Sequence, residues 1–112
     1  MPSPRPGKPV RGSRTGRPLM AALDLLGRRW ALRVLWELRH DTLSFRALQA
    51  SCDAMSPSVL NQRLAELRET ALIHAESEHG YSLTTLGREL LARLLPLTVW
   101  AEKWAKIVGE PK

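Results

Sequence analysis

Apolar residues recur at helical spacing through most of this 112-residue chain, and short polar or turn-forming segments separate the runs. The clearest run lies in residues 56–68, where Leu60, Leu64 and Leu67 fall on one side of a helix. Ser56 is a favoured N-cap, and the proline that follows it suits the first helical position. The pattern therefore predicts a helix with a specified start, a leucine face and a polar face.

Four other segments have the same helical spacing: residues 19–26, 29–38, 45–51 and a long apolar stretch from 85 to about 108. Gly27 is expected to end the first of them, and Ser44 and Thr84 are expected to cap the third and the last. Pro96 lies well inside the last helix, where it removes a backbone hydrogen bond and should cause a kink.

A small hairpin is predicted between the fourth and fifth helices. Residues 72–76 and 81–83 read as two short strands, and Gly80 lies in the turn between them. The helices at 45–51 and 56–68 are joined by a brief turn, which is the helix-turn-helix arrangement. We therefore expect a mainly α domain with a β-hairpin wing, a winged helix-turn-helix, over residues 18–108, followed by a short tail at 109–112.

Charge is concentrated at the N-terminus. The chain carries a net charge of +6, of which residues 1–17 supply five and the rest of the chain one. These seventeen residues hold four prolines, three glycines and no aromatic residue, so we expect a disordered basic arm when the protein is free. Its basic residues are candidate contacts to the DNA backbone: Arg5, Lys8, Arg11, Arg14 and Arg17. Binding in a minor groove and simple solubility both remain open for this arm.

The polar face of the 56–68 helix holds residue types that read bases and phosphates in a major groove. The candidate base contacts are Ser58, Asn61, Gln62 and Arg63. Ser56 at the helix start and Arg46 on the preceding helix are candidate backbone contacts. The alternative is an ordinary amphipathic helix whose polar face is solvated.

The last helix holds more apolar surface than a small domain can bury by itself. Trp100 and Trp104 are four residues apart and should stack on one face. We expect a homodimer through the terminal helices, with an interface of Met20, Leu23, Leu97, Trp100, Trp104 and Ile107. The alternative is that these side chains fold back on their own domain.

No catalytic or metal constellation is evident in the sequence. Cys52 is the single cysteine and the three histidines are scattered, so neither a disulfide framework nor a cysteine zinc site is expected. No glycine-rich phosphate loop and no apolar run of membrane-spanning length is present. We therefore expect a cytoplasmic protein that is not an enzyme, has no cofactor and does not contact membranes.

The chain resembles the HxlR-type winged-helix transcriptional regulators, relatives of the MarR-like regulators, over residues 18–108. The segments that carry the resemblance are ALDLLGRRW at 22–30, LWEL at 35–38, SFRAL at 44–48, MSPSVLNQRLAEL at 55–67 and YSLTTLGREL at 81–90. The resemblance implies a bacterial or archaeal regulator that binds double-stranded DNA as a homodimer. It also implies that residues 56–69 form the recognition helix and that the terminal helices form the dimer interface.

Two features depart from the family. Many members carry a sensing cysteine followed by proline just before the first helix, but Arg17 occupies that place here and excludes redox sensing at the usual position. Cys52 is expected to be a small buried residue rather than a sensor. The wing is short and contains Glu76 and Glu78, which would repel phosphates, so we expect it to contribute little to DNA affinity.

Two functions from different classes follow. The first is a sequence-specific regulator that reads a pseudo-palindrome with half-sites about 34 Å apart or somewhat more. The second is a winged-helix protein-interaction module whose basic tail binds nucleic acid non-specifically. A small-molecule effector is not indicated by any residue, and it would have to bind between the subunits.

Overall fold

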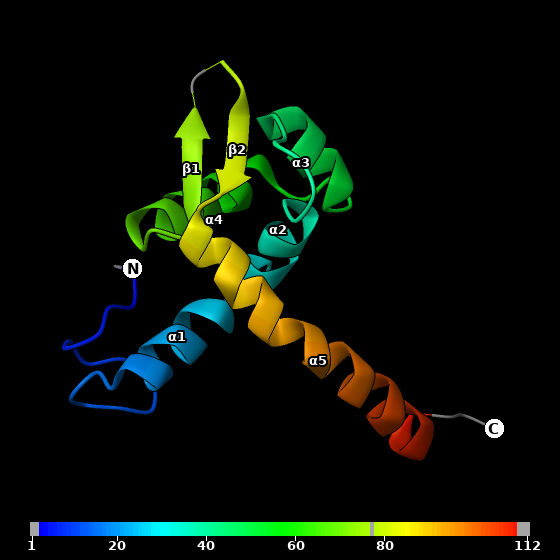
Figure 1. The fold of residues 1–112 in the computed structure, drawn as a ribbon. Coiled ribbons are helices and arrows are strands. Elements are labelled where there is room, and N and C mark those ends of the chain that lie inside the picture. The colour runs from blue at the N-terminus through cyan, green and yellow to red at the C-terminus, as the bar shows by residue number, and fades with distance from the viewer. Residues whose placement is uncertain (1–2, 77, 110–112) are drawn as a thin grey trace.

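The computed structural model describes residues 3–76 and 78–109, and over these residues it contains five helices and one two-stranded sheet. In chain order the elements are α1 (Pro18–Leu26), α2 (Ala31–Glu37), α3 (Phe45–Ser51), α4 (Pro57–Glu69), β1 (Ile73–Glu76), β2 (Gly80–Leu83) and α5 (Thr85–Val108) (Figure 1). This is the predicted order, and it confirms the winged helix-turn-helix class.

Side-chain hydroxyls start three of the helices, as expected. The hydroxyl oxygens of Ser44, Ser56 and Thr84 accept from backbone N–H groups in the first turns of α3, α4 and α5. Helix α2 starts two residues later than predicted, because Trp30 adopts a left-handed conformation with φ of 76°. A helix cannot continue through that conformation, so Ala31 is the first helical residue.

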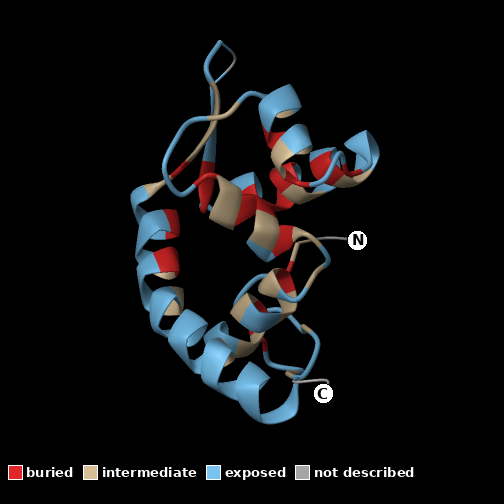
Figure 2. Ribbon diagram, turned by 90° about the vertical axis from the view of Figure 1, so that its right-hand side faces the viewer, coloured by how far each residue is buried: buried red, intermediate tan, exposed pale blue. Residues whose placement is uncertain are grey.

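The core lies where α2, α3 and α4 meet the base of the hairpin. Leu35, Leu48, Leu60 and Leu67 have no exposed surface. Figure 2 shows most of the buried residues, in red, gathered where these elements meet. The predicted leucine face of α4 is therefore confirmed, and the opposite face of the helix is left free.

The hairpin is anchored to the segment before α3. Strands β1 and β2 pair antiparallel from Ile73↔Leu83 to Glu76↔Gly80. Tyr81 also exchanges two backbone hydrogen bonds with Leu43, at 2.8 and 3.0 Å. Gly80 has φ of 99°, and a Cβ there would collide with the carbonyl oxygen of Leu43. A glycine is required at this position for so close an approach of two backbones.

Helix α5 leaves the domain after its first turns. Gly87 and Leu91 are its buried residues, and the second half of the helix projects beyond the other elements (Figure 1). Figure 2 shows that the helix curves along its length, and Pro96 lies in its middle. The curvature agrees with the bend that an internal proline predicts.

Residues 3–17 form turns beside α1 without entering a helix or a strand. The Gly7 N–H donates to the Gly16 carbonyl at 2.9 Å, and the Arg11 N–H donates to the Asp24 carboxylate at 3.1 Å. Pro4 and Gly16 are buried. The expected disorder of residues 1–17 in solution stays a prediction, and the contacts described here are the ones that a mobile arm would have to lose.

Candidate nucleic-acid interface

Helix α4 presents a continuous polar stripe to solvent. Ser58, Asn61, Gln62 and Ala65 are all exposed, and their spacing of three, four and seven residues places them on one face. The stripe begins in the first helical turn, beside the Ser56 cap. It therefore has the length and the side-chain chemistry that a base-reading helix needs.

The start of α4 is preorganised by two serines. The Ser56 hydroxyl caps the backbone N–H of Val59 and lies 3.1 Å from the Ser58 hydroxyl. Both side chains are exposed at the helix N-terminus, where the backbone dipoles favour an anion such as a phosphate.

The turn between α3 and α4 is held by a specific contact. The Gln49 side-chain amide donates to the Met55 carbonyl at 2.8 Å, and the turn residues Asp53 and Ala54 have φ of 60° and 54°. This contact fixes α3 against the start of α4. Arg46 on α3 is exposed, as a backbone-contacting residue must be.

Cys52 lies under this turn and is fully buried. Burial raises the pKa of its thiol, and the positive charge of Arg33 offsets part of that increase. A buried, protonated thiol is a poor nucleophile. The structure therefore agrees with the expectation that Cys52 has a packing role.

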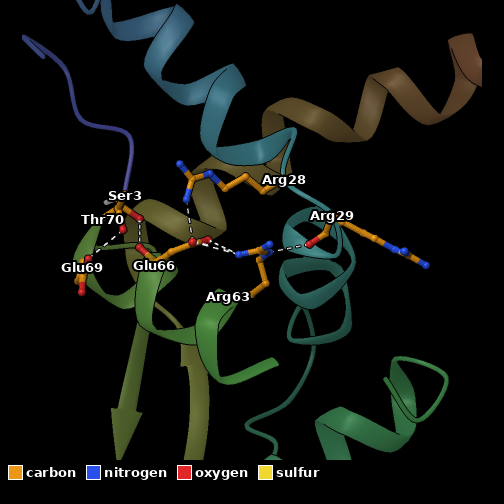
Figure 3. A network of polar contacts seen from close by, with 7 residues as sticks. All are labelled: Ser3, Arg28, Arg29, Arg63, Glu66, Glu69 and Thr70. Carbon is orange, nitrogen blue, oxygen red and sulfur yellow. Dashed lines mark hydrogen bonds and ion pairs between the residues drawn. The ribbon is translucent and has the colours of Figure 1, made fainter. Parts of the chain in front are cut away.

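Arg63 does not share the exposed stripe. Its guanidinium donates to the Arg29 carbonyl at 2.7 Å and to both carboxylate oxygens of Glu66, at 2.9 and 3.0 Å (Figure 3). Its side chain is 15 % exposed. This placement does not support the base contact expected of Arg63, because the guanidinium is already held within the domain.

The wing carries no metal cluster within the described part of the chain. Glu76, Glu78 and His79 are exposed near the hairpin tip. The acidic character expected of this wing is therefore presented to solvent, where it would face phosphates.

The basic residues of the arm lie away from the polar stripe. Arg5, Lys8, Arg11, Arg14 and Arg17 are all exposed, but the segment that carries them runs beside α1 (Figure 1). The Ser3 hydroxyl donates to Glu69, in the last turn of α4 and at the opposite end from Ser58. The structure thus does not bring the arm and the polar stripe together.

The expected interface residues form an exposed apolar surface on α1 and α5. Leu23, Leu97, Trp100, Trp104 and Ile107 are each more than half exposed. The two tryptophan rings stack at a centroid distance of 5.9 Å and an interplanar angle of 9°, as expected. Met20 is half-buried beneath Gly12 of the arm. Within residues 3–76 and 78–109, no helix is apolar enough over a sufficient length to cross a bilayer.

Sequence reasoning missed Glu66 and Arg28. Glu66 is the buried charged residue of the described chain, and Arg28 donates to it at 2.7 Å. The spacing of Arg63 and Glu66 by three residues is a signal for an ion pair within α4. Nothing in the sequence indicates that Arg28, from another segment, meets the same carboxylate.

The HxlR-like helix-turn-helix family model matches residues 25–108, three quarters of the chain. The chain belongs to this family. The HTH-type transcriptional regulator YdzF of Bacillus subtilis is 32 % identical over 101 residues, which cover 84 % of this chain and 89 % of YdzF. YvaP of the same organism is 28 % identical over 89 residues, which cover 74 % of this chain and 82 % of YvaP.

Solved structures have the same fold. The quinone-bound YodB of B. subtilis superposes with a TM-score of 0.72 at 26 % identity, over 77 % of this chain and 96 % of YodB. A MarR-family transcriptional regulator from Enterococcus faecalis V583 gives a TM-score of 0.71 at 29 % identity, over 80 % of this chain and 86 % of its own. This HxlR-like protein is a transcriptional regulator with a helix-turn-helix domain, and its relatives are regulators rather than enzymes.

Proposed function

We propose that this protein binds a pseudo-palindromic operator in the bacterial cytoplasm as a homodimer, with α4 of each subunit in the major groove. The observation that carries the proposal is the exposed polar stripe of α4, which is backed by fully buried leucines. A helix held by its leucine face against the core can present the opposite face to DNA without rearrangement. Its position as the second helix of a helix-turn-helix matches that of recognition helices.

The proposed base contacts are made by Asn61 and Gln62, whose amides can pair with an adenine edge. Ser58, one turn earlier, contacts a base or the backbone. Ser56 at the cap and Arg46 on α3 contact phosphates, because both are exposed beside the start of α4.

The proposed dimer buries the apolar surface of α1 and α5. Trp100, Trp104 and Ile107 lie on one side of α5, beyond the part that packs on its own domain. Burial of such side chains stabilises a complex by about 1.5–3 kcal/mol each before the entropy of association is subtracted. A two-fold dimer also explains why the operator should be symmetric, since it presents two copies of α4.

Selection of random DNA duplexes by the purified full-length protein tests this function. We expect enrichment of a symmetric sequence with two half-sites about one helical turn apart or somewhat more. A double variant, Asn61→Ala with Gln62→Ala, should fold with the wild-type unfolding midpoint and lose the enrichment. If the wild-type protein enriches no symmetric sequence, the proposal is wrong.

A protein-interaction module is the second candidate, and the charge distribution favours it. Residues 18–112 carry a net charge of only +1, and the exposed wing is acidic. In that case α4 would dock on a protein, and DNA binding would reside in the arm. Binding to all duplexes with equal affinity, lost when residues 1–17 are removed, would support this second function.

A further inference from the structure

Glu66 is a buried carboxylate on the proposed DNA-reading helix, and it lies at the flank of the polar stripe, one turn after Gln62. Its side chain is 6 % exposed and accepts hydrogen bonds from two arginines, Arg28 at 2.7 Å and Arg63 at 2.9 and 3.0 Å. Figure 3 shows the two guanidinium groups approaching this carboxylate from different parts of the chain. The cluster therefore has two positive charges and one negative charge in a largely water-excluded place.

The two arginines connect α4 to the junction between α1 and α2. Arg28 lies in that junction, one residue after the Gly27 cap of α1. Arg63 lies on α4 and donates to the carbonyl of Arg29, the next residue of the same junction. Two polar contacts thus link one side of α4 to a segment of four residues, 27–30. That segment directly follows α1, and α1 carries the exposed Leu23 of the proposed dimer surface.

Stability alone does not account for a cluster of this kind. Removing charges from water is costly, and a buried ion pair often stabilises a fold no more than apolar side chains of the same size would. What such a cluster does require is one geometry, because each donor must point at its acceptor for the charges to be compensated. Apolar packing between α4 and the junction would lack such directional contacts.

We propose that Glu66 is a positioning residue for operator recognition. By holding Arg28 and Arg63, it fixes the orientation of α4 relative to α1, and in a dimer joined through α1 and α5 it thereby fixes the separation of the two α4 helices. Glu66 contacts no DNA itself. The inference rests on the proposed function, and it assigns the choice of half-site spacing to a residue outside the polar stripe.

The variant Glu66→Gln tests the role, with Glu69→Gln as the matched control. Both substitutions remove one negative charge from α4, but Glu69 is exposed and lies outside the arginine cluster. Binding is measured on the selected operator and on versions with the half-sites one base pair closer or farther apart. We expect Glu66→Gln to lose about ten- to hundredfold affinity on the operator, as when one set of base contacts is misplaced.

The spacing series gives the readout that a merely structural role would not change. The wild-type protein and Glu69→Gln should prefer one spacing, and Glu66→Gln should bind all three with similar, weakened affinity. Both variants should bind non-specific DNA equally. Arg28→Gln should reproduce the loss of spacing preference, since it removes the tie between Glu66 and the junction while leaving the pair between Arg63 and Glu66. It carries the test if Glu66→Gln does not fold.

Two negative outcomes are distinguishable. If the folded Glu66 and Arg28 variants keep the wild-type operator affinity and spacing preference while their unfolding midpoints fall, the cluster is only structural and this inference is overturned. If the wild-type protein selects no symmetric operator, the proposed function fails first, before any variant is compared.

Discussion

Gln62 lies in the middle of the exposed stripe of α4, and its amide can donate to and accept from one base edge at the same time. Gln62→Ala should therefore cost about 1–3 kcal/mol on the cognate operator and relax the preference at one base pair. Competition binding with single-base operator variants measures both effects. Non-specific DNA is the control and should bind unchanged, because an amide that reads a base contributes nothing there. An equal loss on every sequence would assign Gln62 to the backbone instead.

For individual residues, the sequence predicts the roles of side chains whose partners lie within their own segment. The Ser56 cap, the leucine face of α4 and the exposure of Asn61 all follow from local chemistry and helical spacing. Arg63 is different, because its position at the flank of the helix leaves two directions open. The carbonyl of Arg29, 34 residues earlier, supplies a partner on the inner side. No local pattern contains that information.

Among the elements, α5 depends on the cap at its start. The Thr84 hydroxyl accepts from the Gly87 N–H at 2.9 Å and donates to the Ala71 carbonyl at 2.8 Å, so it ties the helix to the segment before β1. Thr84→Ala should lower the free energy of unfolding by about 0.5–2 kcal/mol. Denaturant titration measures the loss. Thr85→Ala, at the exposed next residue, is the control and should stay within about 0.5 kcal/mol of the wild type. Equal losses in the two variants would contradict the capping role.

Element order and type could be predicted here because caps, turns and apolar periodicity agree along the chain. The start of α2 could not, since Trp30 adopts a left-handed backbone conformation at a position that no glycine marks in the sequence. The same holds for the pairing of Leu43 with Tyr81. That bridge joins residues far apart in sequence and needs the assembled core to bring them together.

For the whole molecule, the exposed tryptophans of α5 predict self-association. Trp104→Ala removes half of a stacked pair from each subunit, and truncation of a tryptophan at an interface hot spot costs about 2 kcal/mol or more. The dimer dissociation constant should therefore rise by at least about tenfold. Sedimentation velocity over a concentration series measures it. Leu32→Ala is the control, because Leu32 is an exposed apolar residue outside α1 and α5. A wild-type protein that remains monomeric at every concentration would refute the dimer.

The five positive charges of the arm favour contact with DNA phosphates, but in the structure the arm lies beside α1. Fully extended, seventeen residues span about 55–60 Å, which exceeds the 47 Å longest extent of the described molecule. The arm is thus long enough to leave α1 and reach phosphates beside α4. Deleting residues 1–17 should weaken binding to all sequences and reduce the log–log salt slope by up to about 4–5 units per subunit. A full-length variant with glutamine at the five basic positions should give the same slope, since the effect comes from charge. If neither variant changes the slope, the arm does not touch DNA, and its contacts with Asp24 and Glu69 are then its role in the fold.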